Sequence, residues 1–172
     1  MKRILMLIGV LFLASSFVGL SQSKVKIGYI DSQKLLSLMP ERLEAQKKLQ
    51  EFAKSLEDQL ASMNSELQEK YNEYIEKKDS LSDFLKQTKE KDIQDLQAKI
   101  QSFQLSAQQE LQKKEQELVQ PIIDKASNAI KKVAKSKGYT YVFDVSSGAF
   151  LYWPESGSED LLPLVKKELG IQ

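Results

Sequence analysis

Residues 49–74 read LQEFAKSLEDQLASMNSELQEKYNEY, and the spacing of their apolar side chains decides the fold. The apolar and aromatic positions recur at intervals of 3-4-4-3-4-4-3, and they are Leu49, Phe52, Leu56, Leu60, Met63, Leu67, Tyr71 and Tyr74. An eleven-residue repeat corresponds to about 3.67 residues per turn, so one apolar stripe stays on one side of a nearly straight helix. The stretch therefore predicts a long amphipathic helix whose stripe needs a partner.

A second stripe of the same period follows further along the chain. Its positions are Leu96, Ile100, Phe103, Ala107, Leu111, Lys114, Leu118, Ile122, Lys125, Ala129 and Val133. Between the stripes, residues 79–83 (DSLSD) break the pattern and supply capping side chains, with Ser80 or Ser82 as the expected N-cap of the returning helix. We therefore predict an antiparallel helical hairpin in which the numbers of facing residues sum to about 163.

Two prolines delimit this hairpin, which we call the arm (residues 40–120). Before it, residues 24–30 alternate like a half-buried strand, and Asp31 and Ser32 can cap a short helix that runs to Met39. Pro40 suits the first turn of the next helix. Pro121 lies inside the second helical pattern, where a proline removes a hydrogen bond, so we expect a kink at the joint between arm and body.

The body comprises residues 24–39 and 121–172. After Pro121 the helix should continue to Gly138, a residue suited to a left-handed helix end. We expect residues 139–153 to form a β-hairpin and a last helix to run from Pro163 to Gly170. The predicted fold class is α+β and mainly helical, with a long antiparallel helical-hairpin arm on a small β-containing body.

A body of 68 residues is small for a stable core. A single core of that size contributes only about 3–5 kcal/mol without disulfides or metals, so oligomerisation is the available source of stability. Apolar groups on both faces of the expected strands fit that role. The candidate residues for the body core and the oligomer interface are Ile27, Tyr29, Ile30, Val142, Phe143, Phe150 and Tyr152.

The first 23 residues have the pattern of a secretory signal peptide, with a basic head followed by an apolar run. We expect cleavage near Ser21 or Ser23, so that the mature chain starts near Lys24 and is exported. An uncleaved anchor is the alternative, because apolar residues persist to Leu20 and a membrane span needs roughly 20 of them.

The composition argues against an enzyme. The chain contains no Cys and no His, which removes thiol chemistry, the commonest general base and the commonest transition-metal ligand. Asp31, Asp144 and Glu155 could converge on a cation, but capping and turn roles are favoured. The arm carries 13 Lys and Arg against 17 Asp and Glu, and the body 10 against 7, so nucleic acid is not an expected partner. We expect no cofactor, no metal and no catalytic site.

Two surface features remain as candidates for binding. Phe84 and Leu85 lie where the stripe is interrupted, so they are the candidate contacts for a polypeptide partner. Lys131, Lys132, Lys135 and Lys137 could make weak contact with an anionic membrane surface, although cations in the last turns of a helix also complement its dipole.

Four segments resemble the Skp/OmpH family of periplasmic chaperones. They are residues 27–32 (IGYIDS), 121–138 (PIIDKASNAIKKVAKSKG), 141–144 (YVFD) and 160–170 (DLLPLVKKELG), and the likeness covers essentially all of residues 24–172. The resemblance implies a homotrimer whose three arms enclose a cavity. It also implies a Gram-negative host and ATP-independent holding of unfolded outer-membrane β-barrel proteins in the periplasm, which prevents their aggregation.

The chain departs from the family pattern in two places. Residues 71–95 carry five Lys against seven Asp and Glu, whereas family arms are often strongly basic, so we expect capture to depend less on charge. Leu162 stands before Pro163, where a capping Thr is expected. The rival interpretation is a structural or adaptor coiled coil of the cell envelope, which would bind one folded partner rather than several unfolded ones.

Overall fold

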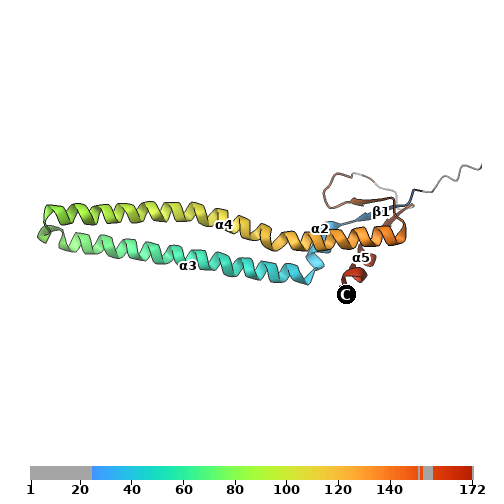
Figure 1. The fold of residues 1–172 in the computed structure, drawn as a ribbon, viewed down its shortest axis with the longest axis horizontal. Helices are drawn as coiled ribbons and strands as arrows, with labels where there is room; N and C mark the ends of the chain where they lie inside the picture. The colour runs from blue at the N-terminus through green and yellow to red at the C-terminus, as the bar shows by residue number, and fades with distance from the viewer. Residues whose placement is uncertain (1–24, 151, 153–156, 172) are drawn as a thin grey trace, which may run out of the picture.

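A computed structural model describes residues 25–150, 152 and 157–171. Two long helices form an extended arm, and a small body with a β-sheet lies at one end of it (Figure 1). The predicted fold class, a mainly helical α+β protein with a helical hairpin on a small β-containing body, is confirmed. The expected signal peptide, its cleavage sites and Lys24 lie outside the described residues.

The arm starts where the chain turns out of the body. Helix α2 (Ser32–Leu38) is capped by Asp31, whose carboxylate accepts a 2.8 Å hydrogen bond from the backbone N–H of Lys34. Met39 is extended and ends α2. Pro40 then opens helix α3 (Pro40–Lys77), where its missing N–H leaves no helical hydrogen bond unmade. The predicted helix start at Pro40 is confirmed.

The chain reverses at the far end of the arm through η2 (Lys78–Ser80) into helix α4 (Asp83–Lys137). Of the two expected caps, Ser82 is the N-cap of α4, and its hydroxyl accepts a 3.4 Å hydrogen bond from the N–H of Leu85. At the other end of α4, Gly138 has a φ of 70°, a conformation in which a Cβ would be strained. The predicted reversal and helix end are both confirmed.

Contacts between α3 and α4 set the register of the arm. Glu73 lies 3.2 Å from Lys89, and the ammonium group of Lys114 lies 6.0 Å from the centre of the Phe52 ring. The residue numbers of these two pairs sum to 162 and 166, which confirms the expected sum of about 163 for facing residues. Leu96 and Ile100 of the α4 stripe are buried, whereas Leu56, Leu60 and Phe103 are only half-buried, since each helix has a single neighbour there.

The sheet of the body is parallel throughout. Strand β1 (Ile27–Ile30) lies between β2 (Tyr141–Asp144) and β3 (Ser158–Asp160), and it pairs in parallel with both. In the register, Ile27 faces Tyr141 on one side and Ser158 on the other. The predicted β-hairpin of residues 139–153 is wrong, because β2 pairs with β1 and the described residues of the expected second strand form no strand.

The third strand is not where the sequence pattern placed it. Ala149, Phe150 and Tyr152 belong to no strand, and residues 151 and 153–156 lie outside the described residues. β3 is a short polar segment without a β-branched or aromatic residue, so its strand conformation comes from pairing with the edge of β1 rather than from propensity.

The last helix begins one residue earlier than predicted, as α5 (Leu162–Leu169). Asp160 compensates for the missing cap, because its Oδ1 accepts a 2.9 Å hydrogen bond from the backbone N–H of Leu162. The helix ends at Gly170, with a φ of 69°, as expected.

The core of the body lies between the sheet and helices α2, α4 and α5. Leu35, Leu161 and Val165 are fully buried, and Ile30 is 2% exposed. The end of α4 adds a buried row at helical spacing, namely Ile122, Ala126, Ala129 and Val133. α4 is therefore shared between the arm and the body core.

We predict that Gly28→Ala destabilises the body. A Cβ at this position would lie 2.2 Å from Cδ1 of Leu161 and 3.1 Å from the ring of Tyr139, and such overpacking costs about 1–3 kcal/mol. Urea unfolding measures the loss. Leu161→Val removes the clashing carbon, so the double variant should lose less than the two single variants combined. An unchanged unfolding midpoint for Gly28→Ala would contradict the close packing.

We also predict that the variant Leu60→Cys/Phe103→Cys crosslinks within one chain when it is treated with a short bifunctional thiol reagent. The two side chains line one groove between α3 and α4, and the chain has no other cysteine. Mass measurement on denatured protein distinguishes internal from intermolecular links. The control pair Leu60→Cys/Leu85→Cys lies out of register and should remain unlinked. Efficient linking only between chains would refute the hairpin register.

Candidate functional site

The far end of the arm exposes a group of apolar side chains, which we call the tip patch. Its members are Tyr71, Ile75, Phe84 and Leu85, with exposed fractions of 49%, 52%, 76% and 46%. They flank the reversal, with two on α3 and two on α4, whereas the neighbouring stripe residue Tyr74 is buried. Both candidate contact residues, Phe84 and Leu85, thus lie on the surface, which is the condition that a binding role requires.

Beneath the tip patch, polar contacts tie the two helices together. The hydroxyl of Tyr74, a residue only 6% exposed, donates to Glu90, and this hydrogen bond raises the pKa of Tyr74. Glu73 accepts from Lys77 at 3.1 Å and pairs with Lys89 at 3.2 Å, and both cations lower the pKa of its carboxyl. These pairs join the two helices beside the tip patch, whose apolar side chains are exposed among charged neighbours such as Asp83.

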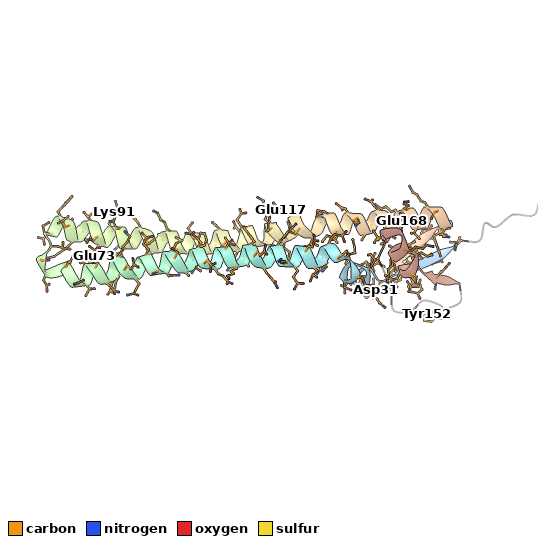
Figure 2. All side chains as sticks on the ribbon, turned by 90° about the horizontal axis from the view of Figure 1, so that it is seen from below. Asp31, Glu73, Lys91, Glu117, Tyr152 and Glu168 are labelled. Carbon is orange, nitrogen blue, oxygen red and sulfur yellow. The ribbon has the colours of Figure 1, made fainter. Side chains whose placement is uncertain are left out.

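A groove of about 280 Å³ runs along the middle of the arm, and the sequence analysis missed it. Its apolar lining comes from both helices and consists of Ala53, Leu56, Leu60, Phe103, Ala107 and Leu111. Ala53 and Ala107 interrupt rows of larger residues, so the two helices leave space there. Figure 2 shows that charged side chains such as Glu73, Lys91 and Glu117 are spread along the arm.

The body presents a second apolar surface on the side of the sheet away from its core. The register pairs Ile27 with Tyr141 and Tyr29 with Phe143, so these four side chains share one face. The ring of Phe150 lies 4.8 Å from that of Phe143. We call these five residues the aromatic face; Tyr141 is 57% exposed in it.

The other candidate core residues lie elsewhere in the body. Ile30 is buried in the core, and Val142 packs against it, as a core role requires. Tyr152 is 82% exposed and lies at the side of the body, where Figure 2 labels it. Within one chain, the candidate residues are therefore divided between the core and the exposed surface.

Asp144 organises the loop beyond β2. Its carboxylate accepts hydrogen bonds from the hydroxyl and N–H of Ser32, at 2.5 and 3.2 Å, and from both donors of Ser146. Burial alone would raise the pKa of Asp144, but these bonds outweigh it and hold the pKa below its usual value. Of the three carboxylates that could meet at a cation, Asp31 caps α2 and Glu155 lies outside the described residues. No group of three metal-ligating side chains occurs in the described part of the chain.

The far end of the sheet is held by a second polar cluster. The hydroxyl of Tyr139 donates to Glu159, and Lys26 lies 4.0 Å from the centre of the Tyr139 ring and 3.5 Å from Glu159. Burial and the bond to Glu159 raise the pKa of Tyr139 to about 12. The cluster fastens β3 to the strand β1 that precedes the arm.

The joint between arm and body lies at Pro121, inside α4. Figure 1 shows α4 shifting its course in the yellow-to-orange part, where the arm meets the body. Across the joint, Lys125 donates to Glu41 at the start of α3, and this contact lowers the pKa of the Glu41 carboxyl. The kink assigned to Pro121 remains a prediction.

The lysines near the end of α4 stand in two settings. Lys132 pairs with Glu168 of α5 at 2.5 Å, whereas Lys135 and Lys137 occupy the last turn of α4, where they complement the helix dipole. Among the described helices, none combines the length and apolar content needed to span a bilayer.

Known proteins resemble this chain in sequence and in fold. A protein of Aquifex aeolicus (strain VF5), described as uncharacterized, is 30% identical over 155 residues, which cover 90% of this chain and 77% of that protein. A crystal structure from Caulobacter crescentus CB15, of a protein described as a candidate OmpH-like outer membrane chaperone, superposes with a TM-score of 0.70. It covers 84% of this chain and 83% of its own at 14% identity, so it supports the fold. The model of the outer membrane protein (OmpH-like) family matches residues 26–169, and the chain therefore belongs to that family.

Proposed function

We propose that this protein is an ATP-independent periplasmic holdase, which binds unfolded outer-membrane β-barrel proteins and prevents their aggregation on the way to the outer membrane. The observation that carries the proposal is an arm of two helices whose apolar side chains are left partly exposed, in the tip patch and in the mid-arm groove. Membership of the OmpH-like family, and the likeness to a candidate chaperone, support the same role.

The chemistry of the arm suits a client without a fixed shape. Unfolded barrel segments expose strand edges and alternating apolar side chains, both of which drive aggregation. Several small apolar sites, separated along an arm about 57 Å long, can each take a side chain of an extended segment. Each such contact is weak, so the client can be released without nucleotide hydrolysis.

Assembly into a homotrimer belongs to the same proposal. The helices of the body leave the aromatic face of its parallel sheet uncovered, whereas parallel sheets usually have both faces covered. Subunits that meet through this face would bury it and stabilise a body of marginal size. Three arms would then surround one space in which a client is kept from other clients.

The N-terminal residues 1–23 have the role of a signal peptide in this proposal, and the mature protein acts in the periplasm. The lysines at the end of α4 give the body a basic surface that can make weak contact with anionic lipid. An adaptor coiled coil of the envelope would use the same arm, but it would bind one folded partner. Suppression of aggregation of several unrelated unfolded barrel proteins therefore distinguishes the two functions.

We predict that Phe84→Ser/Leu85→Ser weakens client binding by about 30-fold, because it removes two exposed apolar side chains that each contribute about 1 kcal/mol on burial, and about 1.4 kcal/mol corresponds to a tenfold change. Trimer mass and helix content should not change. The measurement is affinity for an unfolded barrel protein at 0.15 M and 1 M salt, since exposed charges are largely screened at the higher concentration.

The matched control is Leu43→Ser/Leu105→Ser, which removes two other exposed apolar residues of the arm, away from the tip. Its effect should be smaller. A large loss of affinity at 1 M salt, without any effect of the tip variant, would show that basic groups hold the client instead.

We predict that Tyr141→Ser/Phe143→Ser converts the trimer into folded monomers, because both residues belong to the aromatic face and neither is fully buried within one chain. Sedimentation equilibrium measures the mass, and circular dichroism checks the fold. Tyr71→Ser, a change of similar size at the tip, should leave the trimer intact. A double variant that remains trimeric would assign assembly to another surface.

A further inference from the structure

A groove of about 550 Å³ opens on the body between α2 and α5, on a part of the surface to which the proposed function gives no role. Part of its lining is apolar, from Leu38 at the end of α2, Leu162 at the start of α5, and Ile171 beyond it. Leu38 is 40% exposed, so this apolar surface is open to a ligand. The groove is large enough for one or two side chains of a peptide.

The groove is also strongly cationic. Lys34 of α2 and Lys166 and Lys167 of α5 line it, and none of the three forms an ion pair within the part of the chain that the structure describes. The nearby carboxylate of Glu168 does not neutralise them, because it is paired with Lys132 of α4 at 2.5 Å. Three ammonium groups against the single carboxylate of Asp160, beside an apolar surface, favour a ligand that is anionic and apolar at once.

One acidic residue, Asp160, narrows the choice of ligand. Its Oδ1 is engaged by the N–H of Leu162, while its side chain also lines the groove. A carboxylate there repels a ligand that is anionic throughout, such as a lipid phosphate, and it attracts a ligand that carries an N–H donor beside its anion. The last residue of a polypeptide has that combination, with a backbone N–H one residue-length from a free carboxylate.

We propose that this groove binds the free carboxyl terminus of an unfolded polypeptide that ends in an apolar residue. The terminal carboxylate pairs with the three lysines, the terminal side chain packs on Leu38 and Ile171, and Asp160 accepts the terminal backbone N–H. Capture of a C-terminal carboxylate is an established mode of peptide recognition. The inference rests on the proposed function in that the ligand is a client chain, and it assigns the body a part in choosing clients.

The test uses the full mature protein and a fluorescein-labelled peptide of glycines and serines that ends in Leu-Phe with a free carboxylate. Fluorescence anisotropy should show that amidation of the carboxyl end weakens binding by about tenfold, as expected for loss of hydrogen bonds to a charged group. The variant Lys34→Gln/Lys166→Gln/Lys167→Gln should bind both peptides equally weakly. The control Lys131→Gln/Lys135→Gln/Lys137→Gln removes the same charge from α4 and should still discriminate between them.

Equal affinity of the wild-type protein for the two peptides would overturn the inference, and so would equal loss in both triple variants. Binding to vesicles containing phosphatidylglycerol, if lost in the groove variant while peptide discrimination persists, would assign the lysines to a membrane surface instead. Suppression of barrel-protein aggregation is measured in parallel. If the wild-type protein suppresses aggregation but binds the free and the amidated peptide equally, only the role of the groove is overturned. If the wild-type protein holds no client at all, the proposed function is overturned.

Discussion

Parallel pairing of β1 with β2 is the constraint on which the rest of the structure depends. The N–H of Thr140 donates a 2.7 Å hydrogen bond to the carbonyl of Lys26, which joins two residues 114 positions apart. The whole arm lies between them, so α3 and α4 must return the chain to the place it left. If α3 and the arm part of α4 differed in length, β2 would lie away from β1. The core around Ile30 and Leu161 would then not form.

The arm meets this constraint with little packing of its own. Each helix has one neighbour along most of its length, so much of its stripe is only half-buried, although Tyr74, Leu96 and Ile100 are buried. Ion pairs such as Lys47 with Glu51 and Lys70 with Glu66 are exposed and contribute little to stability. The same lack of cover that limits the arm's own stability leaves apolar side chains available to another polypeptide. The stability of the arm and its binding of a polypeptide therefore both depend on each helix having only one neighbour.

The body has the opposite character, with a dense core on one side of its sheet and an exposed aromatic face on the other. Successive side chains of β1 point to opposite faces of the sheet. Gly28 and Ile30 therefore face the core, while Ile27 and Tyr29 belong to the aromatic face. Gly28 allows Leu161 and Tyr139 to approach the strand closely. This close packing holds α5 against the sheet, and α5 carries two of the three lysines that line the groove between α2 and α5.

The sequence by itself determined the features that depend on neighbours in the chain: the helical period, the cap at Asp31, a reversal capped by Ser80 or Ser82, and the end at Gly138. It also placed Phe84 and Leu85 where the stripe breaks. Tertiary structure alone decided the parallel course of β3, a polar segment whose conformation comes from the free edge of β1. It also decided that Tyr74 is buried while Tyr71 is exposed, and it formed the mid-arm groove and the groove between α2 and α5. Helical periodicity and capping depend on residues a few positions apart, so a single segment of sequence predicts them. Strand pairing, burial and the formation of grooves depend on which distant segments come into contact.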